Sequence, residues 1–215
     1  MAVKKYFCRK HCKLLPYQST PLVDISDHPA LRTAGVRVLV KREDANHPLV
    51  SGNKWWKLKY NLQKAIEQGY STLLTFGGAY SNHLFATAAA TAAIGLRAIG
   101  IVRGEETLPL NPTLDFAKKQ GMQLAYVSRS EYREKDDPVF LQKLHERFGD
   151  FYAIPEGGTN EYAVKGCEEL GRLLDSIPAD TICLPVGTGG TMAGLIRGVT
   201  GKRIIGFPVL KDAEF

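Results

Sequence analysis

The chain has 215 residues, which is enough for one large domain or two small ones with a buried core. Its composition, 44% hydrophobic and 23% charged, is that of a globular protein and excludes disordered, collagen-like and membrane-embedded classes. The net charge of +6 suits an anionic ligand, but the basic residues are spread along the chain, so neither nucleic acid nor a membrane is an expected partner.

The cysteine content indicates a reducing compartment. Four cysteines are too few for a disulfide scaffold, and the first 30 residues show no secretory leader pattern, so we expect the cytoplasm. Cys8, His11 and Cys12 lie close enough to suggest a metal site. A structural zinc needs four ligands and no partner pair follows, so we expect no metal.

Strand and helix patterns alternate along the chain. In order, we expect strand 36–40, helix 54–68, strand 72–76, helix 83–94, strand 97–102, helix 112–120, strand 123–127, helix 138–148, strand 151–154, helix 161–174, strand 181–186, a helix after Thr191 and strand 203–207. The most apolar stretch, residues 84–96, is about half the ~20 residues of a membrane span and indicates a buried helix. Such alternation predicts an α/β fold with open parallel sheets, helices on both faces and ligands beyond the carboxyl ends of the strands.

A glycine-rich segment, Gly187-Thr188-Gly189-Gly190-Thr191, joins the strand at 181–186 to the next helix. Small residues there let backbone N–H groups converge on an anion, and the helix dipole favours negative charge, so the segment is a candidate phosphate cradle. It lacks the Gly-Lys-Ser/Thr ending of a triphosphate loop, and Met192 stands where a dinucleotide fingerprint needs glycine. A tight turn that only packs helix on strand is the alternative.

Lys54 follows Ser51-Gly52-Asn53 at the start of the first amphipathic helix. The helix dipole disfavours a cation at that end and lowers the pKa of the amine. A neutral amine is what Schiff-base chemistry with a carbonyl requires, whereas the alternative is a solvated lysine beside an exposed turn.

The segment from Gly77 to His83 has small residues at a strand end and polar residues at a helix start, as expected for a ligand-facing loop. Ser81 is either a nucleophile or a helix N-cap, and its flanking residues do not match the Gly-x-Ser-x-Gly elbow of hydrolases. His83 is either a base or a polar residue on an exposed helix turn, and the second reading is favoured.

A lysine amine, a phosphate cradle and a polar loop together suggest pyridoxal 5'-phosphate, whose aldehyde needs the first and whose phosphate needs the second. Five segments occur here in the order and spacing of one known group, and the chain resembles the family of D-cysteine desulfhydrase and 1-aminocyclopropane-1-carboxylate deaminase. This family lies within the tryptophan synthase β-subunit class of pyridoxal phosphate enzymes, fold type II. The five segments are residues 41–44 (KRED), 51–54 (SGNK), 77–83 (GGAYSNH), 155–160 (PEGGTN) and 186–191 (VGTGGT).

The resemblance implies roles for particular residues and a division into domains. Lys54 would form the Schiff base, Asn82 would hydrogen-bond the phenolic oxygen of the cofactor, and Gly187, Thr188, Gly189, Gly190 and Thr191 would hold the phosphate. Ser81 would lie beside the substrate carboxylate or act on the substrate. Residues 1–59 and 151–215 would form the larger cofactor domain, residues 60–150 a smaller inserted domain, and the protein would be a homodimer.

The implied reaction is a lyase or deaminase reaction on a small amino acid, foremost α,β-elimination from D-cysteine to pyruvate, ammonia and sulfide. Deamination of 1-aminocyclopropane-1-carboxylate is the alternative, a racemase or dehydratase is more distant, and a cofactor-binding protein without turnover is a reading of another class. The deaminases carry Gln where this chain has Tyr80, and Thr-Arg where it has His83-Leu84, which weakens the ring-opening assignment.

Family members continue well beyond the strand at 203–207, and the resemblance places the partner of the pyridine nitrogen in that later part. We therefore expect the 215-residue chain to be a fragment whose larger domain is incomplete at its C-terminus.

Overall fold

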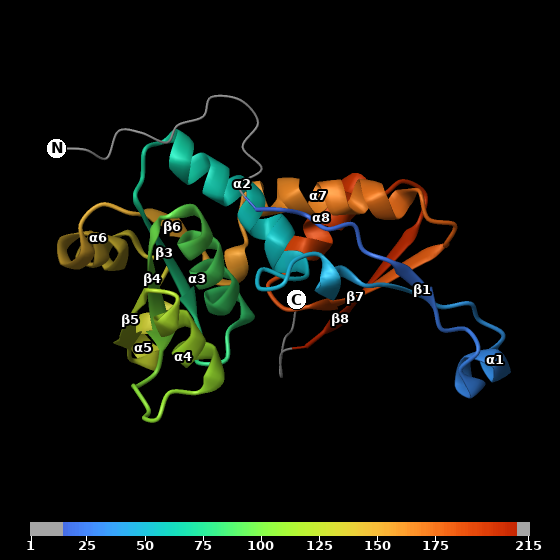
Figure 1. Cartoon of the computed structure of the whole chain (residues 1–215), viewed down its shortest axis with the longest axis horizontal. Coiled ribbons are helices and arrows are strands. Elements are labelled where there is room, and N and C mark those ends of the chain that lie inside the picture. The colour runs from blue at the N-terminus through green and yellow to red at the C-terminus, as the bar shows by residue number, and fades with distance from the viewer. Residues whose placement is uncertain (1–14, 210–215) are drawn as a thin grey trace.

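The computed structural model of the chain describes residues 15–209 (Figure 1). Cys8, His11 and Cys12, the residues considered for a metal site, lie outside the described residues. Within residues 15–209, no group of three or more His, Cys, Asp or Glu side chains is placed to hold a metal ion. No helix in that range combines the length and the apolar character needed to cross a bilayer.

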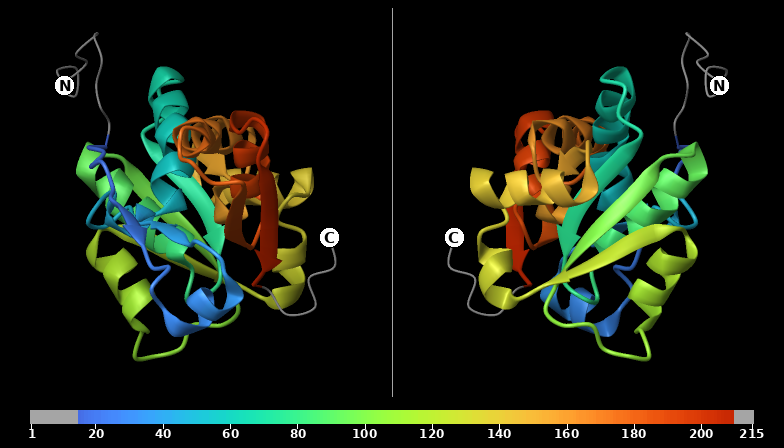
Figure 2. Two further views of the ribbon diagram at one scale, coloured as in Figure 1. Left: turned by 90° about the vertical axis from the view of Figure 1, so that its right-hand side faces the viewer. Right: turned by 90° about the vertical axis from the view of Figure 1, so that its left-hand side faces the viewer.

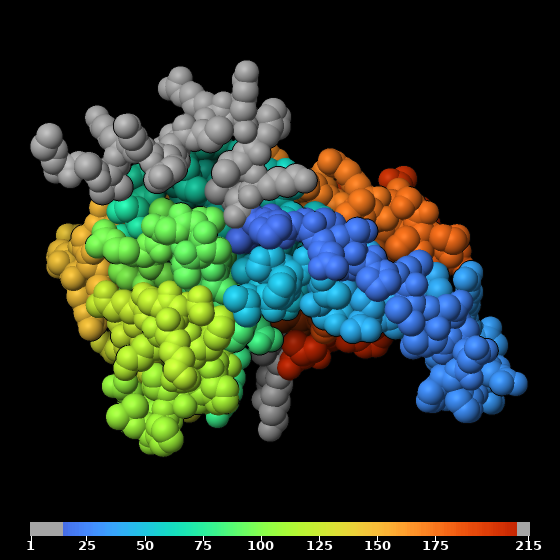
Figure 3. Space-filling view, viewed as in Figure 1, coloured from blue at the N-terminus to red at the C-terminus, as the bar shows by residue number. Residues whose placement is uncertain are grey.

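The N-terminal arm, residues 22–41, projects from the body of the molecule (Figures 1 and 3). Strand β1 (Leu22–Asp24) pairs antiparallel with β2 (Leu39–Lys41), and the short helix α1 (Pro29–Ala34) lies between them in sequence. The sequence predicts a strand at 36–40, which begins three residues before β2, and does not predict β1 or α1. Every residue of β1 is exposed and α1 buries none, so neither carries the burial periodicity by which an element is recognised.

The central sheet has four parallel strands in the order β5-β4-β3-β6. Their twist is visible in the side views of Figure 2. The strands are β3 (Thr72–Gly77), β4 (Arg97–Arg103), β5 (Met122–Val127) and β6 (Tyr152–Ile154). These match the expected strands to within one residue at either end.

Helices cover both faces of this sheet, and β4 shows how its residues are divided between them. Ala98 and Val102 pack in one apolar cluster with α3 (Asn82–Ile94) and α4 (Pro112–Lys119). Ile99 and Ile101 pack in a second cluster with α5 (Arg129–Arg133) and α6 (Pro138–Phe148). Because alternate residues of a strand point to opposite faces, a continuous apolar run is the pattern of a strand buried on both sides.

Strand β6 begins just after the expected domain boundary at residue 150, yet it belongs to the sheet formed before that boundary. It pairs with β3 through Leu73↔Tyr152 and Thr75↔Ile154, so the sheet of residues 72–127 includes a strand that the sequence places in the other domain. The division into domains stays a prediction, but this sheet does not end at residue 150.

The largest core joins α2 (Asn53–Glu67), α7 (Glu161–Asp175) and α8 (Gly190–Gly198) with the parallel pair β7 (Thr181–Val186) and β8 (Arg203–Pro208), and it also takes in α3, β3 and β6. Two glycines allow the helices to approach closely. A Cβ at Gly166 of α7 would lie 1.9 Å from the Trp56 carbonyl oxygen of α2, and a Cβ at Gly194 of α8 would lie 2.3 Å from Cys167 Cβ. The helix carrying Lys54 and the helix following the glycine-rich segment are therefore both packed on α7.

Candidate functional site

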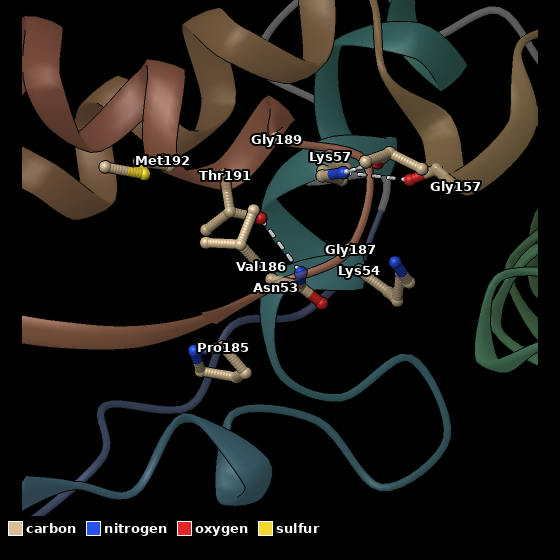
Figure 4. Close-up of a pocket in the computed structure, with 11 residues that line it drawn as sticks. Asn53, Lys54, Lys57, Gly157, Pro185, Val186, Gly187, Gly189, Thr191 and Met192 are labelled. Carbon is tan, nitrogen blue, oxygen red and sulfur yellow. Dashed lines mark hydrogen bonds between the residues drawn. The ribbon is translucent and has the colours of Figure 1, made fainter. Parts of the chain in front are cut away.

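A cavity of about 130 Å³ opens where three segments meet (Figure 4). The segments are the first turn of α2, the short 3-10 helix η2 (Glu156–Gly158) that follows β6, and the loop between β7 and α8. The lining residues are Asn53, Lys54, Lys57, Gly157, Pro185, Val186, Gly187, Thr188, Gly189, Thr191 and Met192.

The start of α2 is fixed by hydrogen bonds to the residue before it. Gly52 has φ 65° and ψ −145°, a conformation that favours glycine. The buried Asn46 brackets this residue: its Nδ2 donates to the Gly52 carbonyl (3.1 Å) and its Oδ1 accepts from the Gly52 N–H (3.0 Å). Glu43 Oε2 also accepts from Trp56 Nε1 (2.7 Å), so the first turn of α2 is held from both sides. This bracket sets where Lys54 enters the cavity wall.

Lys54 has a pKa lowered from 10.5 to about 8. Burial is the main cause, and the neighbouring charge of Lys57 is the second. The sequence predicts a lowered pKa at this residue, and the structure agrees in direction while assigning it to burial instead of the helix dipole. At pH 7 about one Lys54 side chain in ten is then neutral, against about one in 3,000 for an ordinary lysine.

Lys57 is a second lysine in the cavity, which the sequence analysis does not single out. It is only 2% exposed, and its Nζ donates to Gly157 O (3.0 Å), Thr159 Oγ1 (3.1 Å) and Thr188 Oγ1 (3.3 Å). Burial lowers its pKa. One feature of the sequence could have identified Lys57 as a site residue: it follows Lys54 by three residues and lies among the tryptophans and leucines of the buried face of α2. Lys57 ties η2 to the loop between β7 and α8.

The loop from Gly187 to Thr191 forms the other wall of the cavity. Gly189 has φ 75° and precedes α8 without any side-chain cap, so the first N–H groups of the helix have no capping side chain. No atom lies within 4 Å of a Cβ placed at Gly187 or Gly189, so the loop backbone is open on that side. Thr191 Oγ1 accepts from Asn53 Nδ2 (2.9 Å), which joins the loop to α2. The predicted phosphate cradle and Lys54 therefore line one cavity.

Ser81 is the N-cap of α3, and its Oγ accepts from the backbone N–H groups of His83 and Leu84, each at 3.2 Å. The N-cap alternative is thereby confirmed for Ser81. Ser81 and Asn82 follow the carboxyl end of β3, beside the end of β6 that leads to Gly157, but neither lines the cavity. Their contacts with substrate and cofactor stay predictions.

His83 is buried, with 2% of its surface exposed, so the favoured reading of a polar residue on an exposed turn is wrong. Its Nε2 lies 2.8 Å from Thr75 Oγ1 of β3. Burial, followed by the charges of Lys54 and Lys57, holds the pKa of His83 well below 6.5. Sequence alone could not place it, because the three residues before it, Tyr80, Ser81 and Asn82, are polar and typical of an exposed turn.

Comparisons with known proteins agree with this geometry. Residues 14–209 match the family model described as pyridoxal-phosphate dependent enzyme. A candidate 1-aminocyclopropane-1-carboxylate deaminase of Thermotoga maritima is 38% identical over 77% of this chain and 55% of its own length. The mitochondrial bifunctional D-cysteine desulfhydrase/1-aminocyclopropane-1-carboxylate deaminase of Arabidopsis thaliana is 30% identical over 84% of this chain and 50% of its own.

Among solved structures, a homologue of 1-aminocyclopropane-1-carboxylate deaminase superposes with a TM-score of 0.75 at 26% identity, covering 95% of this chain and 68% of that one. The chain spans about half the length of the curated relatives it matches.

Proposed function

The chain belongs to the family of pyridoxal-phosphate dependent enzymes. From that premise we propose that it is part of a lyase or deaminase that acts on a small amino acid. The reaction we propose first is α,β-elimination from D-cysteine, giving pyruvate, ammonia and sulfide. One observation carries the proposal: a partly buried lysine with a pKa of about 8 shares a cavity with an open, glycine-rich loop at a helix N-terminus.

The residues of the cavity fit the cofactor on both counts. An aldehyde needs a lysine amine that is neutral in part at physiological pH, and Lys54 is one. A phosphate needs several N–H donors and a positive charge. The loop Gly187–Thr191 offers the backbone N–H groups, and the Lys57 ammonium, which is hydrogen-bonded to Thr188 of that loop, adds the charge. A Cβ at Gly190 would lie 3.2 Å from Lys57 Nζ and 2.8 Å from the Thr159 side chain, so glycine is required for this close approach.

When bound, pyridoxal phosphate supplies an aldehyde for the substrate amine and a ring that accepts the electron pair left at the substrate α-carbon. Lys54 Nζ would hold the α-proton of the substrate, and its lowered pKa suits both accepting and returning that proton.

We further propose that Asn82 contacts the phenolic oxygen of the cofactor and that Ser81 lies beside the substrate carboxylate. Their place at the carboxyl end of β3, the sheet end at which Gly157 also lies, supports this. We propose a cytoplasmic homodimer as the working form. The free Cys167 and Cys183 support the compartment, and the exposed Leu22, Val23 and Val36 of the N-terminal arm support a second copy.

D-Cysteine is preferred to 1-aminocyclopropane-1-carboxylate because of the loop at the carboxyl end of β3. Tyr80, which is 77% exposed, and His83, which is buried, stand where the deaminases of the family carry other residues. The names of the relatives include both activities, so the two substrates remain the direct comparison.

A parallel assay of the 215-residue chain with added pyridoxal phosphate separates these readings. We expect sulfide and pyruvate from D-cysteine at a rate at least about tenfold above 2-oxobutanoate release from the cyclopropane acid. The reverse ratio would assign the alternative reaction. If the chain binds the cofactor but forms no product from either amino acid, the result would support the reading of a cofactor-binding protein without catalytic turnover.

The cofactor should also attach with a pH dependence set by Lys54. Below about pH 8 the neutral fraction of the amine, and with it the rate of Schiff-base formation, should rise about tenfold per pH unit, and it should level off above that value. Stopped-flow absorbance at constant ionic strength measures this. A rate that continues to climb through pH 10 would contradict the lowered pKa.

Thr191→Ala should weaken binding of pyridoxal phosphate roughly ten- to hundredfold, since a hydrogen bond to a charged group is worth ~1.5–3 kcal/mol. Thr191 Oγ1 already accepts from Asn53, which leaves its hydroxyl hydrogen to donate to the phosphate. Pyridoxal, which lacks the phosphate, should bind both proteins equally, and the exposed Thr200→Ala should bind as the wild type does. Equal losses for pyridoxal and its phosphate would show that Thr191 acts only through folding.

A further inference from the structure

A chain of two hydrogen bonds fixes the tautomer of His83. Thr75 Oγ1 donates its single hydrogen to the carbonyl oxygen of Ile154 (2.9 Å), which lies on the neighbouring strand β6. Thr75 Oγ1 must therefore accept in its second contact, with His83 Nε2 at 2.8 Å. Nε2 carries the hydrogen, and Nδ1 of the neutral ring carries a lone pair.

That lone pair has no partner. His83 Nδ1 is buried and makes no hydrogen bond to any residue the structure describes. The ring packs on Gly158 so closely that a Cβ there would lie 3.0 Å from His83 Cε1 and 3.5 Å from Lys57 Cβ. An acceptor left empty in a buried place costs free energy, which is why such atoms in native proteins have a structural or functional reason.

His83 packs against Gly158, and Lys54 and Lys57 line the cavity together with Gly157, the residue before it. The two lysines differ in their hydrogen bonds. Lys57 Nζ uses its three hydrogens on Gly157, Thr159 and Thr188. Lys54 Nζ has no hydrogen-bond acceptor among residues 15–209. The residues around Gly157 and Gly158 thus include a buried acceptor without a donor, His83 Nδ1, and a partly buried amine without an acceptor, Lys54 Nζ.

We propose that His83 is a positioning residue for Lys54, with Nδ1 accepting one N–H of the Lys54 amine whenever that amine is not bound to the cofactor. This rests on the proposed function of Lys54. The four-carbon stem of lysine is flexible, so the proposed contact calls for rotation of the Lys54 side chain and of the atoms that now enclose Nδ1, not for movement of the helix. With one hydrogen held by His83, the remaining hydrogens and the lone pair of Lys54 are oriented instead of turning freely, which favours proton transfer at a fixed position.

Two substitutions separate the two nitrogens of the ring. In His83→Gln the amide nitrogen can still donate to Thr75 in place of Nε2, but no acceptor remains at Nδ1. In His83→Asn the side-chain oxygen takes the place of Nδ1, and the contact with Thr75 is lost. An acceptor stabilises an ammonium more than a neutral amine, so its removal lowers the pKa of the lysine.

The experiment is an NMR titration of the isotope-labelled 215-residue chain without cofactor, following the Lys54 Cε resonance and the ring nitrogens of residue 83. We expect a His83 ring with hydrogen on Nε2 only. The pKa of Lys54 should fall by about one unit, a tenfold change in its acid dissociation, in His83→Gln and stay within about 0.3 units of the wild type in His83→Asn. Thermal unfolding of both variants shows whether each is folded.

An unchanged Lys54 pKa in a folded His83→Gln would overturn the proposal, as would hydrogen on Nδ1 in the wild type. Equal shifts in the two variants would also overturn it, since they would reflect packing alone. None of these readouts needs the cofactor, so they are independent of whether the chain binds pyridoxal phosphate or turns over any amino acid.

Discussion

Lys54→Arg should remove the covalent attachment of pyridoxal phosphate and lower any turnover by at least about 10²–10⁴-fold, the range that a positioned acid-base group contributes. Arginine keeps the positive charge and most of the length of the side chain, but its guanidinium stays protonated and forms no Schiff base with the aldehyde. The change therefore tests the amine chemistry of Lys54 separately from its charge. Borohydride reduction followed by peptide mass mapping locates the attachment.

The matched control is Lys64→Arg, because Lys64 lies on the same helix α2 but does not line the cavity. It should retain the reduced adduct on Lys54 and the visible absorbance band of the wild type. An adduct that persists in Lys54→Arg, at Lys57 or elsewhere, would remove Lys54 from its proposed role.

Gly166→Ala should destabilise the chain by about 2–4 kcal/mol, among the largest effects expected of any single methyl group here. The added Cβ would lie 1.9 Å from the carbonyl oxygen of Trp56, a backbone atom that cannot move aside without shifting α2. Alanine is a better helix former than glycine by ~1 kcal/mol, so the sign of the effect tests whether contact or propensity dominates. Urea unfolding measures it.

Lys165→Ala is the neighbouring control, because Lys165 is exposed on the same helix. It should change the free energy of unfolding by less than about 1 kcal/mol, the value of its contact with the Tyr60 ring. A stability of Gly166→Ala equal to or above that of the wild type would show that α2 and α7 are not packed as closely as described.

The elements that sequence could predict are those that bury apolar residues on both sides. The strands at 72–77 and 97–103 are predicted to within one residue because burial on two faces leaves a continuous apolar run. The N-terminal arm is not, since its strands gain their pairing from each other and bury little.

Site residues could be predicted where the residue type and its local sequence indicate a function. They could not be predicted where the function depends on contacts with residues distant in the sequence. Lys54 and the loop at 187–191 stand out because helix starts and glycine clusters have known uses. Lys57 and His83 do not, because their importance depends on Thr188, Thr159 and Thr75, which come from other elements. No pattern within α2 or α3 reveals those partners.

The short strand β6 also joins the four-stranded sheet to the cavity. Its backbone is hydrogen-bonded to β3, and three residues after its end the Gly157 carbonyl accepts from Lys57, so the chain is held at both points. Only Pro155 and Glu156 separate the sheet from Gly157, which lines the cavity. A substitution that shifts β6 against β3 is therefore expected to displace the wall of the cavity as well.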